Sequence, residues 1–226
     1  MTAMMTISGD LIAYVRSAFI RGLDYAITSD TVRQGINAYT PIEAYPAYIT
    51  AVASVEAFLN EQLLSPIAQA IYPKSCLWGI HNRIDNLSIQ TKTILVPQLL
   101  FGRSLDNSTQ PAQDFGLLVR VRDDLVHYKM KQKAPKYLAD LSQRRIALTS
   151  EQVHSGGQDY AWPHKLSSTE GIRWAHNTAC KVVHKVVECI PEPHKDVLGS
   201  LATNFQEIRE EDVQALWMSH DAAANP

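Results

Sequence analysis

The sequence predicts an all-α fold, a bundle of four to five core helices with shorter peripheral helices around it. Apolar residues recur at spacings of three and four over several long stretches, whereas the alternation typical of strands is nearly absent. Proline, glycine and capping residues separate these stretches, and no internal repeat is visible. The 226 residues are 46% hydrophobic and 19% charged, which is an ordinary globular composition with enough apolar residues for a core. We expect one domain over residues 1–206 and a partly ordered tail over residues 207–226.

Charge and cysteine content limit the classes of protein to which the chain can belong. The net charge of −2 lacks the strong positive field of a bulk nucleic-acid binder, so any nucleic-acid site must be local. Cys76, Cys180 and Cys189 form no disulfide framework, which favours a reducing, cytoplasmic setting. The amino terminus has no signal-peptide pattern, and no apolar window approaches the length of about 18 residues that suggests a membrane span.

The first half of the chain carries two long helical patterns. The pattern over residues 9–27 predicts an amphipathic helix that starts near Ser8. Thr40-Pro-Ile-Glu43 resembles a capping box, although Pro46 is an alternative start for the second helix. That helix is expected to run from Tyr48 to about Ala70, with Pro66 as a possible kink or end.

The middle of the chain predicts a connection and two further helices. Residues 72–86 contain proline, glycine and polar residues and are expected to form a connection whose Trp78 folds back on the bundle. Ser88 is expected to cap a helix to about Leu100, with Gly102 at its end. After a loop, a helix is predicted from Pro111 to about Met130, and apolar residues on most of its circumference favour a central position.

The second half predicts one short helix and one long one. A short helix is expected around residues 137–148, followed by a loop over residues 149–166. Ser167-Ser-Thr-Glu170 resembles a second capping box, and the helix after it is expected to reach about Ile190. A last helix is predicted over residues 194–205.

The candidate functional residues lie near the end of the helix predicted at residues 111–130. Arg122, Asp123 and His127 are unusual residue types for such an apolar helix. Helical spacing places Asp123 and His127 one turn apart on one face, with Arg122 to the side. A carboxylate in this position can orient an imidazole or a guanidinium group.

The segment Arg122-Asp-Asp-Leu-Val-His127 matches the R-x4-H motif and resembles the HEPN superfamily. Ser54-Val-Glu-Ala-Phe-Leu-Asn60 resembles the second-helix pattern of that superfamily, with Glu56 and Asn60 one turn apart. Residues 113–129 resemble its motif helix, and residues 173–178 resemble a helix often found after it. The likeness covers roughly residues 45–190 and implies a HEPN-like helical bundle that forms a homodimer, with two motifs facing each other across a cleft.

The resemblance also implies a function. Many HEPN proteins are metal-independent endoribonucleases of toxin–antitoxin or antiphage systems, and others are non-catalytic dimerisation or binding modules. The first function would make Arg122, Asp123 and His127 catalytic and RNA the substrate, with an antitoxin or another protein as a possible partner. An arginine can stabilise a phosphorane and a histidine can move protons near neutral pH, so the residue types suit this chemistry.

Other residues are candidates for supporting roles. The lysine run after the motif, with Lys129, Lys131 and Lys133, could hold an RNA backbone, although cations also suit a helix carboxyl terminus. Glu56 and Asn60 could line the cleft or, as an ordinary helix pair, hold the motif arginine in place. The alternative to catalysis is a structural role for both residues. Arg122 would then belong to a buried network of ion pairs, and His127 would be hydrogen-bonded at a dimer interface.

A metal site and a cofactor site are not expected. The potential metal ligands His176, Cys180, His184 and Glu188 repeat every four residues, but such a series drifts by about 40° per step around a helix. No second group of ligands accompanies them, and no phosphate-binding, dinucleotide-binding or hydrolase motif is present in the sequence.

Overall fold

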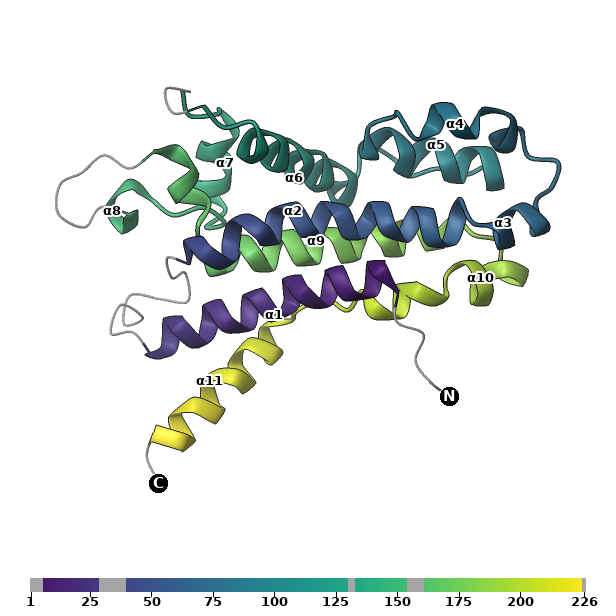
Figure 1. Ribbon diagram of the computed structural model, residues 1–226. Coiled ribbons are helices and arrows are strands. Elements are labelled where there is room, and N and C mark those ends of the chain that lie inside the picture. Colours follow the sequence, from purple (N-terminus) through teal and green to yellow (C-terminus); the bar gives the residue numbers. More distant parts are fainter. Residues whose placement is uncertain (1–5, 29–39, 130–132, 154–160, 225–226) are drawn as a thin grey trace.

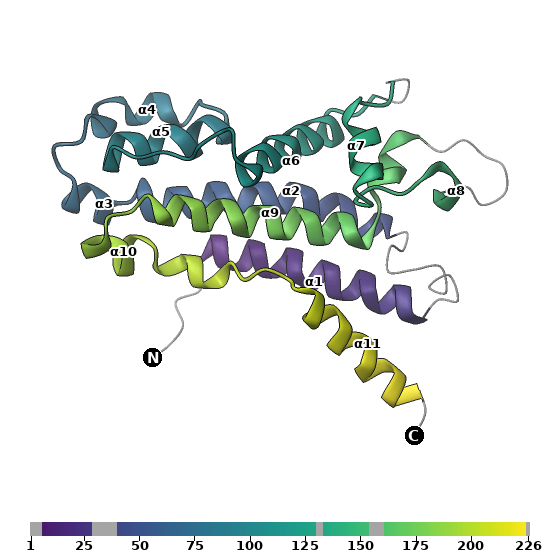
Figure 2. The ribbon, with the colours of Figure 1, turned by 180° about the vertical axis from the view of Figure 1, so that it is seen from behind.

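A computed structural model describes residues 6–28, 40–129, 133–153 and 161–224 of the chain. These residues form helices, turns and loops and no strand, which confirms the prediction of an all-α protein. Three long helices lie side by side: α1 (Ile7–Thr28), α2 (Pro41–Phe58) and α9 (Thr169–Glu188). The helix α6 (Gln110–Val126) lies on the opposite side of α2 and α9 from α1, as both views show (Figures 1 and 2).

The core lies between these four helices and follows the predicted apolar stripes. The helix expected over residues 9–27 is confirmed as α1, and most of its apolar residues at helical spacing are buried. Val15, Phe19 and Leu23 of the expected stripe are buried, whereas Leu11, which was expected with them, is half-buried and Ile12 beside it is buried. The stripe of α9 is buried in the same way, from Ile172 to Val186. Within the described residues, no helix combines the length and the apolar character that crossing a membrane would require.

The expected long helix over residues 48–70 begins earlier and is interrupted. Of the two starts that the sequence offers, the one at Thr40-Pro41 is confirmed and the one at Pro46 is wrong. Helix α2 already begins at Pro41, whose missing N–H costs nothing in the first turn, and Thr40 makes no side-chain cap bond. The chain then passes through a π-helical segment, Leu59–Leu63, and breaks. A separate helix, α3 (Pro66–Ile71), follows, because Ser65 caps it by accepting a hydrogen bond of 3.2 Å from the Ala68 N–H.

The segment between α3 and α6 contains one confirmed helix and two short ones. Helix α5 (Ile89–Phe101) begins at Ser88, whose Oγ accepts from the Thr91 N–H at 3.2 Å. It ends at Gly102, whose φ of 71° favours glycine, as the sequence predicted. The connection predicted over residues 72–86 contains a 3₁₀ turn, Cys76–Ile80, and a short helix, α4 (His81–Ile84).

The short helices between α6 and α9 lie at one end of the bundle (Figure 1). The short helices α7 (Tyr137–Gln143) and α8 (Ser150–Val153) precede a 3₁₀ turn at Trp162–Leu166. The helix start predicted by the second capping box is confirmed, but its cap is one residue later than expected. Ser168, not Ser167, is the N-cap residue of α9, and its Oγ accepts from the Gly171 N–H at 2.9 Å.

After α9 the chain turns back along α1. Its elements are α10 (Glu192–Leu198), a 3₁₀ turn at Ser200–Asn204 and α11 (Glu210–Ala224). The region predicted as a tail therefore contains a helix, whose carboxyl-terminal half points away from the bundle (Figure 1). Its first turns are fixed by the buried Val213 and by an ion pair of 2.6 Å between Arg173 and Glu210.

Candidate functional site

The motif histidine lies at the end of α6 and not within it. The helix was expected to continue to about Met130, but it ends at Val126, and His127 is its C-cap residue with φ −102° and ψ 18°. The His127 N–H still donates to the main-chain oxygen of Asp123 at 2.9 Å. The next residue, Tyr128, lies outside the helix and packs edge-on against Trp162, with ring centroids 5.7 Å apart.

The Arg122 and Asp123 side chains form an ion pair next to the histidine. The Arg122 Nε lies 2.9 Å from the Asp123 Oδ1, although the angle between the groups does not make a hydrogen bond. The arginine side chain is 30% exposed and the aspartate 53%, so the pair lies at the surface with the arginine stem packed inward. Of the two groups that Asp123 was expected to orient, the structure pairs it with Arg122.

The His127 side chain is exposed at the helix end, and its imidazole makes no hydrogen bond within the described part of the chain. His127 is therefore not part of a buried network within the protomer, whereas its hydrogen bond across a dimer interface stays a prediction. Val126 beside it is also exposed, at 54%, which is unusual for a valine in a folded core helix. The histidine is accessible to a substrate or to a second copy of the chain.

The second aspartate of the motif has a structural contact that sequence reasoning missed. The Tyr137 hydroxyl of α7 donates to the Asp124 Oδ2 at 2.8 Å. Burial of the tyrosine, and then its hydrogen bond to the carboxylate, raise the pKa of Tyr137 well above its ordinary value. This hydrogen bond holds α7 against the end of α6 and so supports the surface on which His127 lies.

Glu56 does not contact the motif arginine in the structure. Its Oε1 lies 2.6 Å from the Nζ of Lys92 on α5, whose side chain is only 4% exposed. The interpretation that Glu56 and Asn60 hold Arg122 is wrong in this respect, since Glu56 pairs with Lys92 and Arg122 pairs with Asp123. Asn60 is exposed in the π-helical segment after α2.

The lysines after the motif extend its charged surface. Lys129 and Lys133 are both exposed, close in sequence to His127. Lys131 lies outside the described residues. Their role in holding an RNA backbone stays a prediction.

Of the four potential metal ligands of α9, only His176 and Cys180 contact each other within the described residues. Burial lowers the pKa of His176 to about 4 and raises that of Cys180 to about 12, and the His176 Nδ1 lies 3.7 Å from the Cys180 Sγ. His184 contacts a main-chain oxygen at 2.7 Å, and Glu188 pairs with a lysine three residues before it. Across the described segments, no three His, Cys, Asp or Glu side chains gather as a metal site would require.

Comparisons with family models, with curated proteins and with solved structures gave no match to this chain. The geometry at the end of α6 is therefore the basis for a functional hypothesis. That geometry is an accessible imidazole next to an arginine–aspartate pair, with exposed lysines following it in the chain.

Proposed function

We propose that this protein is a metal-independent endoribonuclease of the HEPN type, which cuts RNA in the cleft of a homodimer. The observation that carries the proposal is the position of His127, exposed at the end of α6 beside the Arg122–Asp123 pair. A histidine that serves only packing would not be expected to lie open to solvent with no partner for its imidazole.

The reaction would be an internal transesterification. An imidazole takes the proton of the RNA 2′-hydroxyl, and the 2′-oxygen then forms a bond to the adjacent phosphorus. The bond from phosphorus to the 5′-oxygen breaks, and that oxygen takes a proton from an imidazolium. The products are a 2′,3′-cyclic phosphate and a free 5′-hydroxyl, and the Arg122 guanidinium stabilises the charge on the phosphorane.

The reaction needs one imidazole as the base and one imidazolium as the acid, which suggests that two copies of the chain take part. The motif provides one histidine per protomer, whereas a two-fold axis near the end of α6 would bring the His127 side chains of both protomers together. The exposed Val126 supports this arrangement, because a dimer contact would remove its apolar side chain from water. Asp123 would then hold the Arg122 fork in place while the histidines move protons.

A toxin or antiphage role follows from such an activity. Cleavage of cellular RNA stops growth, so a protein of this kind would need an antitoxin or another partner to hold it inactive. Expression of the wild-type chain alone should arrest growth, and His127→Ala should remove the arrest.

The direct test is cleavage of a labelled single-stranded RNA by the purified protein in the presence of EDTA. We expect a 2′,3′-cyclic phosphate end, and a loss of rate of at least about 100-fold in both Arg122→Ala and His127→Ala. The matched control is His81→Ala on α4, at the other end of the molecule (Figure 1). Wild-type rates in the His127→Ala variant would refute the proposal, and an inactive wild-type dimer would favour a non-catalytic dimerisation module.

A further inference from the structure

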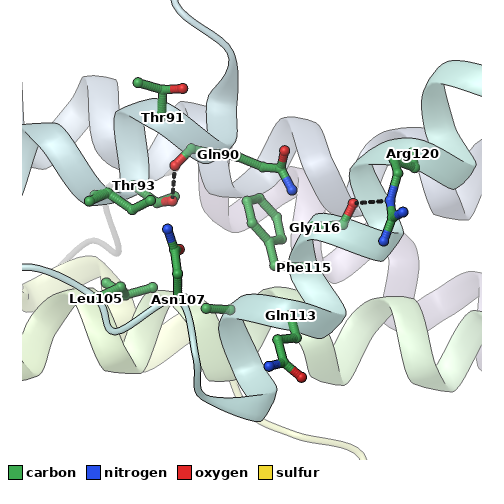
Figure 3. Close-up of a pocket in the computed structure, with 11 residues that line it drawn as sticks. Gln90, Thr91, Thr93, Leu105, Asn107, Gln113, Phe115, Gly116 and Arg120 are labelled. Carbon is green, nitrogen blue, oxygen red and sulfur yellow. Dashed lines mark hydrogen bonds between the residues drawn. The ribbon is translucent and has the colours of Figure 1, made fainter.

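A second feature of α6 is a pocket that the motif does not include. It lies between α5, the loop over residues 103–109 and the first half of α6, and its volume is about 580 Å³. Figure 3 shows the Phe115 ring between Gln90 of α5 and Asn107 of the loop, with Arg120 beyond Gly116 at one end. The volume is in the range of pockets that hold small organic ligands.

The lining of this pocket combines apolar side chains with amides. The apolar side chains are Ile94, Leu105, Ala112 and Phe115. The amides are those of Gln90, Asn107 and Gln113. An amide offers both a donor and an acceptor, so this set can recognise a flat ligand that presents both kinds of atom at its edge.

Several polar atoms of the pocket have no partner in the described parts of the protein. The side-chain amides of Gln90 and Asn107 make no hydrogen bond there. The Arg120 Nε donates to the Gly116 main-chain oxygen at 3.4 Å, and the two terminal nitrogens of the guanidinium pair with no carboxylate. In this respect Arg120 differs from Arg122, whose charge is paired with Asp123.

The pocket is built by specific contacts. The Gln113 Nε2 donates to the Ser108 main-chain oxygen at 2.9 Å and so ties the loop to α6. Within the loop, the Ser108 N–H and hydroxyl both donate to the Asp106 carboxylate, and these bonds lower the pKa of Asp106. A Cβ at position 116 would overlap the Gln90 amide nitrogen, so the glycine leaves room for that amide.

We propose that this pocket binds the base of a nucleotide in single-stranded RNA, with Arg120 on an adjacent phosphate. A nucleobase is flat and apolar on its faces and carries donors and acceptors on its edge, which matches the lining. A simple anion would use Arg120 alone, and an apolar ligand would leave the amides without partners. The position of the base relative to the cleavage site rests on the proposed function, whereas binding itself does not.

The pocket and His127 share one face of α6. Arg120 and His127 are seven residues apart, which is nearly two full turns and about 10 Å along the axis. An extended strand with its base in the pocket could therefore reach His127 through a neighbouring nucleotide. The two carboxylates on the way are engaged, Asp123 by Arg122 and Asp124 by Tyr137.

The experiment measures RNA binding in a protein that cannot cleave. Fluorescence anisotropy on His127→Ala with short single-stranded RNAs of one base each should show a preference for one base. The variant Gln90→Ala, added to His127→Ala, should weaken binding of the preferred RNA about tenfold and reduce the preference. Its control is Gln98→Ala, the same substitution at an exposed position of the same helix that does not line the pocket. Arg120→Ala should weaken all the RNAs and lower the salt dependence of binding.

The outcomes separate this inference from the proposed function. Equal binding by the Gln90→Ala and Gln98→Ala variants would overturn the base pocket even if the wild-type protein cuts RNA. Base-dependent binding without any cleavage by the wild-type protein would support the pocket and refute the nuclease. A nucleoside monophosphate that binds in titrations where the oligonucleotides do not would also overturn the inference, because the pocket would then take a free nucleotide.

Discussion

The buried His176 predicts a specific loss of stability in mild acid. Its side chain is 1% exposed, next to Cys180 and Asn177, and burial lowers its pKa from the ordinary 6.5 to about 4, with a smaller effect from Arg16. The neutral imidazole therefore stabilises the fold fully above pH 6.5. This stabilisation is lost as the pH falls from 6.5 to 4, since the unfolded chain takes up the proton first.

The size of the effect follows from the two pKa values of this histidine. Lowering the pKa from 6.5 to about 4 corresponds to about 3 kcal/mol once both states are protonated, and to about 2 kcal/mol at pH 5. The assay is urea unfolding of the wild type and of His176→Gln at pH 7.5 and pH 5. The wild type should lose about 2 kcal/mol more than the variant between these two conditions.

When the pH dependence of unfolding is compared between the variant and the wild type, the contributions of the other titrating groups cancel. Glu170 works in the opposite direction, because burial raises the pKa of its carboxyl, but it is present in both proteins. An NMR titration of the wild type gives an independent readout, since the His176 ring should stay neutral at pH 5. Equal pH dependence of unfolding in the two proteins, or a ring that is protonated at pH 6, would refute the reasoning.

Two other contacts give predictions of stability. Tyr137→Phe removes the 2.8 Å hydrogen bond to Asp124 and should lower the free energy of unfolding by about 1–2 kcal/mol in urea melts; an unchanged midpoint would mean that the bond contributes nothing. Glu56→Gln leaves the buried Lys92 ammonium without the negative charge that lies 2.6 Å from it, although the amide oxygen can still accept its hydrogen bond. The substitution should cost about 2–3 kcal/mol, somewhat less than for a fully buried pair because Glu56 is 39% exposed. Lys92→Met removes the buried charge itself and should be close to neutral, so a larger loss in Lys92→Met than in Glu56→Gln would contradict this account.

The helix limits that the sequence predicts correctly are those with local signals. Ser88 and Gly102 define α5 because each acts on residues within one turn of it. The end of α6 has no such signal, since no glycine or proline follows Val126 directly, and the contact that Tyr128 makes there is with Trp162, far along the chain. A helical wheel leaves both His127 and Arg122 open as partners of Asp123, and the structure pairs Asp123 with Arg122.

The pocket beside α5 could not be predicted in the same way, because its lining comes from three segments. One sequence signal does point to it. Gly116 lies in the interior of a helix, where glycine is unfavourable by about 1 kcal/mol, and such a residue usually has a packing reason. At Gly116 the packing reason is the Gln90 side chain of α5, which lies against the glycine. Only the structure shows this contact between α5 and α6.

The shared helix makes the two proposals jointly testable. The buried residues Phe115, Leu118 and Val121 fix the orientation of α6 about its own axis. Arg120 and His127 therefore keep a fixed separation on the exposed side of this helix. A nuclease that reads a base at one point of a rigid helix and cuts at another must cut at a constant distance from that base. Mapping of cleavage ends over many RNAs should give one offset from the preferred base, and that preference should fade in Gln90→Ala while cutting continues. Offsets that vary from one RNA to the next would show that the pocket does not set the cleavage position, whatever ligand the pocket binds.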